Sequence, residues 1–282
     1  MRSTATVTLL AAQLLAAIFV AHAKPPSAEL ILRKAEEIRN PDLDYAVDFT
    51  IHGVSRGTVV KERDASYSMI ARGKDRTVIL MRTPELLYGA LVLMADNRYW
   101  MLLPKAAKPW ELSGAQMMNG DIATGELARV NLTTGYTVSL AGEDQDETEA
   151  EECFRLELTQ KDPTARYPRV VYLVKKNGYL PRTLEFYGRK GDLLKVVHFG
   201  DYRKGALGLR SMQLDIESFD EWKEGSTLSF SNLRKLKVTP ASFTQEGLIP
   251  FRDAALSARD AATDAVPLEH IVRGLASPSR LE

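Results

Sequence analysis

One short stretch of the sequence matches a pattern that hydrolytic enzymes use. Residues 53–57 read Gly-Val-Ser-Arg-Gly and fit G-x-S-x-G, in which the serine is a nucleophile on a sharp turn between a strand and a helix. The residues that follow, 58–69, are polar and β-branched and predict a strand where the pattern requires a helix. Ser55 is more simply a hairpin residue, and a hydrolase that uses Ser55 is the least favoured of three hypotheses.

The side chains that bind metals or carry redox chemistry are few and scattered. His52, His198 and His270 are far apart in the sequence, and the acidic run at residues 143–152 lacks the central glycine of a calcium loop. Cys153 is the single cysteine, which excludes an intramolecular disulfide and a C-x-x-C centre, and we expect it to be buried. No Gly-rich phosphate loop is present. We therefore predict no catalytic residue, metal ligand or cofactor, and a protein that is not an enzyme.

The composition is that of an ordinary folded protein. Of 282 residues, 45% are hydrophobic and 26% charged, which excludes a disordered chain and a protein with many membrane spans. The 37 Lys and Arg residues balance the 37 Asp and Glu residues, so the net charge is zero. Without an excess of positive charge, sequence-independent binding to nucleic acid or to an anionic membrane is not predicted. We expect a monomer with no nucleic-acid partner.

Residues 1–23 have the features of a signal peptide. Arg2 stands near the start, an apolar stretch covers residues 9–20, and Ala21 and Ala23 are small residues of the kind that signal peptidase prefers. We expect cleavage after Ala23 and export of the rest. An uncleaved anchor helix is the alternative, but polar residues interrupt a segment that is already near the lower length limit for crossing a bilayer.

A helix is predicted directly after this segment. Ser27 can cap it, and the apolar residues Ile31, Ala35 and Ile38 follow at helical spacing. Asn40-Pro41 ends it, because the residue before a proline is disfavoured in the helical conformation. The spacing therefore predicts one amphipathic helix at the start of the folded part.

An alternating pattern indicates strands from residue 45 onward. Tyr45, Val47, Phe49 and Ile51 alternate with less apolar residues, as in a strand with one buried face. Turn residues then recur at spacings short enough for hairpins and too short for helical crossovers. The sequence thus predicts a mainly β fold with a few helices. Its single antiparallel sheet should curl into an open half-barrel, because the twist of a long sheet accumulates.

Two regions depart from the strand pattern. Residues 104–132 lack alternation, and part of them, 121–130, is compatible with a short helix; we expect this excursion to pack across one face of the sheet. Beyond residue 251 the chain is rich in alanine. A short apolar helical stripe is formed there by Leu268, Ile271, Val272 and Leu275. We expect a tail helix lying on the body, with docking to a partner as the alternative.

Several short strings are similar to those of one protein family. They are Pro84, Gly89, Leu93, Trp100-Met101-Leu102-Leu103-Pro104, Ser113-Gly114, Met118, Gly120-Asp121, Cys153-Phe154-Arg155-Leu156-Glu157-Leu158, Tyr167-Pro168, Leu180-Pro181 and Glu185-Phe186-Tyr187. In their order and spacing they resemble the outer-membrane lipoprotein-sorting family of periplasmic carriers with the LolA-like fold. The resemblance implies an open half-barrel, a helical lid, and between them an apolar cavity that accepts acyl chains.

The lipid-binding residues that we expect follow from a choice of strand phase. Inward-facing pairs are assigned on four strands, and two flexible methionines are added from the excursion. They are Leu91, Leu93, Trp100, Leu102, Met117, Met118, Phe154, Leu156, Tyr172 and Val174. A shift of one residue turns a strand's set outward, so the alternative is that these residues form core on the convex face.

We therefore expect three parts in the chain: a signal peptide at 1–23, the LolA-like lipid-binding domain that the resemblance implies at 24–251, and an Ala-rich, helical or partly ordered tail at 252–282. Our first hypothesis is a periplasmic carrier that binds the acyl chains of lipoproteins or other lipids and shuttles them between envelope membranes. It implies an inner-membrane exporter of the RND or ABC type and an outer-membrane acceptor. The second hypothesis is a non-catalytic accessory subunit of an RND-type exporter.

Overall fold

The structure of the protein is a computed structural model. It describes residues 26–55, 58–96, 98–112, 130–146, 151–161, 167–219, 224–260 and 268–276. The expected signal peptide lies outside the described residues, as do Met117 and Met118 and the segment 121–129 for which a helix is predicted.

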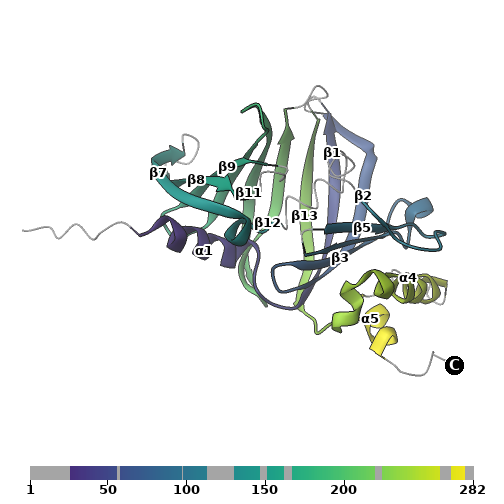
Figure 1. Ribbon diagram of the computed structural model, residues 1–282. Helices are drawn as coiled ribbons and strands as arrows, with labels where there is room; N and C mark the ends of the chain where they lie inside the picture. Colours follow the sequence, from purple (N-terminus) through teal and green to yellow (C-terminus); the bar gives the residue numbers. More distant parts are fainter. Residues whose placement is uncertain are drawn as a thin grey trace, which may run out of the picture.

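The described residues form one antiparallel sheet of 13 strands with helices on both of its faces (Figure 1). The strands are β1 (Tyr45–Ser55), β2 (Thr58–Arg72), β3 (Arg76–Met81), β4 (Leu91–Ala95), β5 (Arg98–Leu102), β6 (Trp110–Glu111), β7 (Tyr136–Asp146), β8 (Glu151–Gln160), β9 (Arg169–Lys175), β10 (Pro181–Tyr187), β11 (Leu193–Gly205), β12 (Gly208–Ser218) and β13 (Glu224–Lys235). The helices are α1 (Ala28–Arg39), η1 (Glu85–Leu87), α3 (Leu132–Gly135), η3 (Pro240–Phe243), α4 (Gln245–Asp260) and α5 (Leu268–Ala276). The prediction of a mainly β fold is confirmed.

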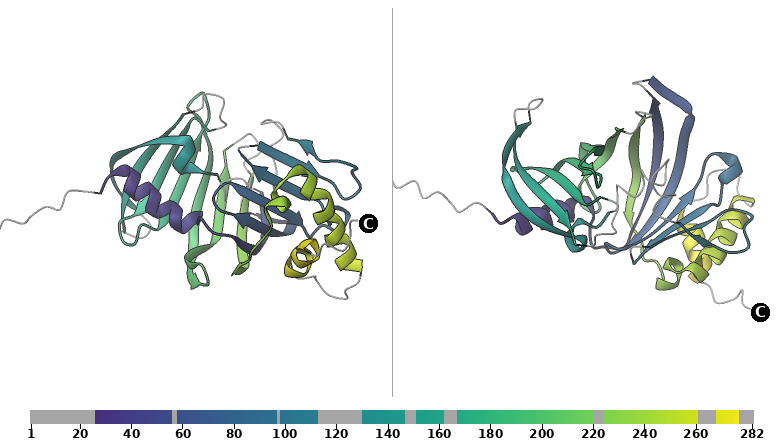
Figure 2. Two further views of the ribbon diagram at one scale, coloured as in Figure 1. Left: turned by 60° about the horizontal axis from the view of Figure 1, so that its bottom comes forward. Right: turned by 45° about the horizontal axis from the view of Figure 1, so that its top comes forward.

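The sheet consists of two meanders joined at its centre. Its strand order is β6-β5-β4-β3-β2-β1-β13-β12-β11-β10-β9-β8-β7, so the first and last strands of the chain pair with each other. The free edges are β6 and β7, which are consecutive in the sequence but unpaired, and the sheet is therefore not closed into a barrel. Figure 2 shows that it curls into an open half-barrel, as predicted.

Helix α1 begins and ends where its sequence predicts. The hydroxyl of Ser27 accepts a hydrogen bond from the backbone N–H of Leu30 (3.2 Å), and Asn40 follows the last turn. Ile31 and Ala35 are buried, as expected from their spacing, and so is Leu32. Each large apolar side chain buried in this way contributes about 1.5–3 kcal/mol, so this face holds α1 against the sheet.

The buried apolar side chains form two clusters, one on each face of the sheet. The inner cluster lies on the concave face with α1 and includes Ile31, Leu32, Tyr45, Val47, Phe49, Ile51, Tyr67, Met69, Val92, Met94, Phe154, Leu156, Leu158, Tyr172, Val174, Leu184, Phe186, Val197, Phe199, Leu214, Ile216 and Leu228. The outer cluster lies between β1–β5 and the C-terminal helices. It includes Ile70, Val78, Leu80, Leu91, Leu93, Trp100, Leu102, Phe243, Leu248, Phe251, Leu268, Ile271 and Val272.

Helices α4 and α5 lie on the outside of the curl, beneath β3–β5 (Figure 2). In α5, Leu268 and Ile271 are 1% exposed, which agrees with a tail helix that lies on the body of the protein. Helix α4 runs from Gln245 to Asp260 and passes through the position at which the tail was expected to begin, after residue 251.

The inward orientation predicted for Leu91, Leu93, Trp100 and Leu102 is wrong. All four belong to the outer cluster, and their neighbours in the two strands, such as Val92, face inward. The physical reason is that β4 is buried on both faces and is apolar throughout. Its sequence therefore does not show which residues face inward. The helices that cover its outer face come from a distant part of the sequence.

The described residues also show the structure around Ser55 and at the start of the excursion at residues 104–132. Ser55 is the last residue of β1 and pairs with Thr58, the first residue of β2, so a strand follows it and the requirement of a nucleophile elbow for a helix is not met. The start of the excursion contains a short strand that alternation did not predict, β6, in which Trp110 pairs with Met101. Cys153 is buried, as expected.

Candidate functional site

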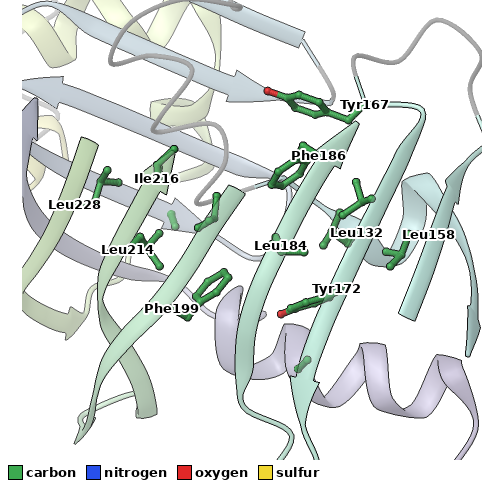
Figure 3. Close-up of a cluster of buried hydrophobic side chains, with 14 of the residues drawn as sticks. Leu132, Leu158, Tyr167, Tyr172, Leu184, Phe186, Phe199, Leu214, Ile216 and Leu228 are labelled. Atoms are coloured by element: carbon green, nitrogen blue, oxygen red, sulfur yellow. The ribbon is translucent and has the colours of Figure 1, made fainter. Parts of the chain in front are cut away.

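The candidate site is the inner face of the half-barrel, where apolar residues of neighbouring strands stand directly opposite one another. One row crosses β8 to β12 through Leu156, Tyr172, Leu184, Val197 and Ile216. A second row crosses β11, β12, β13 and β1 through Phe199, Leu214, Leu228 and Ile51. Figure 3 shows Tyr172, Leu184, Phe199 and Leu214 on four neighbouring strands. The result is one continuous apolar surface rather than isolated buried residues.

Aromatic rings extend this surface along both arms of the sheet. Phe49 and Tyr67 stack with their ring centroids 4.9 Å apart, and Phe230 packs against Phe49 at 5.9 Å. On the other arm, Tyr167 and Phe186 lie 4.7 Å apart in a tilted arrangement. Each such pair stabilises the fold by about 0.5–1.5 kcal/mol beyond the free energy gained from burying the apolar area of its rings. The rings also enlarge the apolar surface of the inner face.

Helix α1 covers part of the inner face, across β7, β8, β10 and β12. Its last turn places two charges in the interior: Arg39 donates from Nε to Oε1 of Glu36 and from Nη2 to Oε2, both at 2.6 Å. These side chains are 2% and 1% exposed. Burial opposes the charge of Arg39, but the adjacent Glu36 carboxylate raises the pKa of Arg39 above its usual value. Arg39 also donates to the backbone oxygen of Val130, so the pair ties α1 to another segment.

Tyr172 lies beneath this ion pair. Its side chain is fully buried on β9. Burial raises the pKa of its phenol well above the usual value, and the negative charge of Glu36 raises it further. Tyr172 is therefore a neutral hydroxyl in the physiological range and contributes mainly its ring to the inner face.

A pocket of about 60 Å³ opens on the inner face, where β1, β12 and β13 meet the end of α1. Its lining is mostly apolar, with Val47, Met69, Met212 and Phe230 among the wall residues. The cations Arg39 and Arg210 are also in its wall. Space on this face is therefore apolar with positive charge at its margin.

A larger groove, of about 650 Å³, lies on the outer face between the sheet and α5. Its walls carry several charged side chains, among them Asp48, Arg234 and Glu269, which have partners. Asp48 accepts hydrogen bonds from Ser68 (2.6 Å) and Asn232 (3.1 Å), and Arg234 pairs with Glu269. The inner pocket is the better candidate for binding hydrocarbon, because it adjoins the continuous apolar cluster of the inner face, whereas the walls of the outer groove carry Asp48, Arg234 and Glu269.

The structure brings together four of the ten residues predicted to bind lipid. Phe154, Leu156, Tyr172 and Val174 share the inner cluster with α1. The four residues of β4 and β5 are on the opposite face, and the two methionines of the excursion lie outside the described residues.

The prediction missed the inner residues of β11 to β13, including Phe199, Leu214 and Leu228, and the charged pair Glu36 and Arg39. The alternation of β11 and β12 could have indicated the apolar ones. Glu36 and Arg39 are three residues apart on a helix, a spacing that also fits a surface pair, so nothing local signals their burial.

The described residues hold no cluster of three or more His, Cys, Asp or Glu side chains that could bind a metal ion. Among the same residues, the structure has no helix with the length and apolar character needed to cross a membrane. The chemistry available on the inner face is therefore that of apolar contact and of arginine charge.

Comparison with solved structures places this architecture among known folds. A LolA superfamily protein from Nitrosomonas europaea has 26% identity and a TM-score of 0.69, covering 79% of this chain and 99% of that chain. A DUF1329 family protein from Desulfovibrio piger has 20% identity and a TM-score of 0.66, covering 78% and 97%. A protein domain from Vibrio parahaemolyticus, named for outer membrane lipoprotein sorting, has 17% identity and the same TM-score and coverage. The latter two show a shared fold alone.

Comparison with sequences gives a narrower result. No curated protein matches the chain significantly. A family model described as "Uncharacterized protein" matches residues 73–249, which is more than half of the chain. The chain therefore belongs to that family, and its resemblance to the lipoprotein-sorting proteins is confirmed at the level of the LolA-like fold.

Proposed function

We propose that this protein is a periplasmic carrier that binds the acyl chains of lipids or lipoproteins on the inner face of its half-barrel and moves them between envelope membranes. The observation that carries the proposal is the continuous apolar inner surface. It extends from β4 through the central strands β1 and β13 to β8. A sheet that is unclosed between β6 and β7 gives such a surface a way to receive a chain. The likeness to a LolA superfamily protein supports the same function.

Apolar contact alone supplies enough affinity for this task. Each methylene group transferred from water to an apolar surface gains about 0.8 kcal/mol. A long acyl chain can therefore be bound without a reacting group, and we propose that the protein is not an enzyme and needs no cofactor. Phe154, Leu156, Tyr172 and Val174, together with Phe199, Leu214 and Leu228, are the proposed contacts.

Binding on this face requires movement. The inner pocket of about 60 Å³ accommodates a small group and not a whole acyl chain, so part of the inner cluster must separate when a chain enters. Helix α1 is the proposed moving part, because it rests on the apolar surface that the ligand would cover. Reversible delivery then follows if α1 and the ligand bind that surface with similar free energy, since a carrier responds to the difference between two states.

The proposed location and partners follow from the carrier function. Residues 1–23 are proposed to be a signal peptide that directs export, and residues 24–251 the lipid-binding domain, with 252–282 as its helical extension. An inner-membrane exporter of the RND or ABC type would supply the lipid, and an outer-membrane acceptor would receive it.

The proposal is tested by native mass spectrometry of the exported protein, followed by organic extraction. We expect a mass excess that organic solvent removes and that is identified as an acyl lipid. Recovery of a membrane exporter with no extractable lipid would favour the accessory-subunit hypothesis. A protein that carries no lipid after purification and takes up none from added lipid would contradict the carrier function.

A matched pair of variants on β12 localises the binding. Met212 lines the inner pocket, whereas the adjacent Gln213 faces the other side of the strand and bonds to Asp215 (2.9 Å). Met212→Gln should lower the amount of retained lipid several-fold, because it places an amide on the apolar surface. Gln213→Met should leave it unchanged. Equal retention by both variants would mean that lipid binds elsewhere.

A further inference from the structure

Arg210 is a cation on the inner face with no acidic partner among the described residues. It lies on β12 in phase with Met212 and Leu214, the latter visible in Figure 3, so its side chain shares their face of the sheet. One guanidinium nitrogen, Nη1, donates to the backbone oxygen of Leu209 (2.9 Å). Its buried Nε has no hydrogen-bond partner.

The contrast with Arg39 shows that this arrangement is unusual within the molecule. Arg39 lines the same pocket but is neutralised by two hydrogen bonds to Glu36. Arg210 has no such neighbour, and burial lowers the pKa of its guanidinium below the usual value. Arg210 is half-buried, and a charge that is partly withdrawn from water loses solvation free energy that an acidic partner would restore; the described residues supply none.

The surroundings of Arg210 define the chemistry that would offset this cost. The pocket of about 60 Å³ beside it has room for one small charged group, and its other walls include the apolar side chains Val47, Met69 and Phe230. A ligand that fits has an anionic end at Arg210 and a hydrocarbon part along the adjoining inner cluster. A planar guanidinium is suited to the paired oxygens of a carboxylate or phosphate.

We propose that Arg210 binds the anionic headgroup, a carboxylate or phosphate, of an acyl lipid whose chain lies on the inner cluster. The inference rests on the proposed carrier function and makes it more specific. Neutral amphiphiles of the same chain length lack the interaction and bind more weakly. The inner face thereby distinguishes acidic lipids from neutral ones by one side chain.

The experiment compares dodecanoate, dodecyl phosphate and 1-dodecanol, each titrated below its aggregation limit into the full exported chain by calorimetry. Wild-type protein should bind the two anionic probes about tenfold more tightly than the alcohol, because a hydrogen-bonded charge pair replaces an unpartnered charge. Acetate and inorganic phosphate, the headgroups without chains, should show no measurable binding. Binding of these free anions as tight as that of the lipids would identify a small-anion site and contradict the proposal.

The variant Arg210→Met should abolish the preference for the anionic probes while leaving the affinity for 1-dodecanol unchanged or higher. Arg210→Lys, which keeps the charge, should retain a part of the preference. The control is Lys204→Met, which removes an exposed cation from the adjacent strand β11 and should change nothing. Equal binding of all probes by wild type, or a preference that survives Arg210→Met, overturns the role of Arg210 while the carrier function stands. Failure of every probe to bind counts against the carrier function itself.

A second measurement does not depend on ligand. Because removal of an unpartnered charge relieves its desolvation, the thermal midpoint of ligand-free Arg210→Met should be equal to or higher than that of wild type. Dodecanoate should raise the midpoint of wild type more than that of the variant, since ligand that binds the folded state stabilises it. A variant that is less stable without ligand and equally stabilised by dodecanoate would assign Arg210 a structural role instead.

Discussion

The two faces of the sheet are both apolar where helices cover them, yet they differ in the polar and charged side chains that lie among the apolar ones. Under α4 and α5, the outer cluster is formed by aliphatic and aromatic side chains. The inner face buries the pair Glu36 and Arg39 and a neutral Tyr172, and it carries the half-buried Arg210, which has no acidic partner among the described residues, beside a pocket. Charges in an interior are rarely needed for stability. This difference agrees with the proposal that the inner face binds a ligand, whereas the outer face holds the C-terminal helices on the sheet.

The largest expected effect concerns the outer face. Phe251 of α4 is fully buried, and Phe251→Ala should lower the free energy of unfolding by about 3–5 kcal/mol in urea denaturation, because it removes buried area and leaves a cavity. It should not change lipid affinity in the folded fraction. Phe199→Ala on the inner face should lower both stability and affinity. Equal effects of the two variants on affinity would remove the distinction between the faces.

The second prediction breaks the ion pair that holds α1. Glu36→Gln leaves the buried Arg39 charge without its carboxylate and should cost about 3 kcal/mol, measured by urea denaturation. The double variant Glu36→Gln with Arg39→Met should recover most of this loss. On the same helix, Glu37 forms exposed pairs with Arg33 and Lys34, so Glu37→Gln should cost less than about 1 kcal/mol. Similar losses for Glu36→Gln and Glu37→Gln would show that the buried pair does not fix α1.

The third prediction probes how closely the start of α4 packs against η3, the short helix that precedes it. A methyl group at Gly247 would meet the backbone oxygen of Ala241, which cannot move as a flexible side chain can. Gly247→Ala should therefore destabilise the protein by about 1–3 kcal/mol. At Gly205, in the β11–β12 hairpin, nothing lies within 4 Å of an added methyl group. Gly205→Ala serves as the control, and a loss of stability there equal to that at Gly247 would contradict close packing of α4 on η3.

The smallest effect is expected from Tyr172 at alkaline pH. Because its pKa is raised in the folded protein, its contribution to stability is fully present below about pH 10 and is lost as the pH rises further and the unfolded chain ionises. One unit above pH 10 the loss is about 1.4 kcal/mol. Urea denaturation at pH 10 and at one unit above it should show a smaller decrease in the free energy of unfolding for Tyr172→Phe than for wild type. Identical decreases would mean that Tyr172 is not held neutral by its surroundings.

The sequence predicts the parts of this fold whose signals are local. Ser27 and Asn40 mark the ends of α1, and the alternation of Tyr45 to Ile51 gives the buried face of β1 correctly. Phe154 and Leu156 also have the predicted orientation, because β8 alternates between apolar and polar residues.

The parts that could not be predicted depend on contacts between distant segments. Leu91 and Trp100 face outward because α4 and α5 cover them, and those helices come after the last described strand of the sheet in the sequence. Arg210 is the third residue of β12, close to the hairpin that joins β11 and β12, where an arginine is more often a surface charge. Its position over an apolar pocket arises from the curl of the whole sheet, which no local pattern specifies.

Binding of acyl chains on the inner face can be located by photo-crosslinking with a fatty acid that carries a diazirine group in its chain, followed by peptide mass spectrometry. The account predicts adducts on inner-face peptides of β11, β12 and β13, around Phe199, Leu214 and Leu228, and their loss when excess unlabelled lipid competes. Adducts on α4 and α5, or none that lipid competes away, would contradict binding of acyl chains on the inner face.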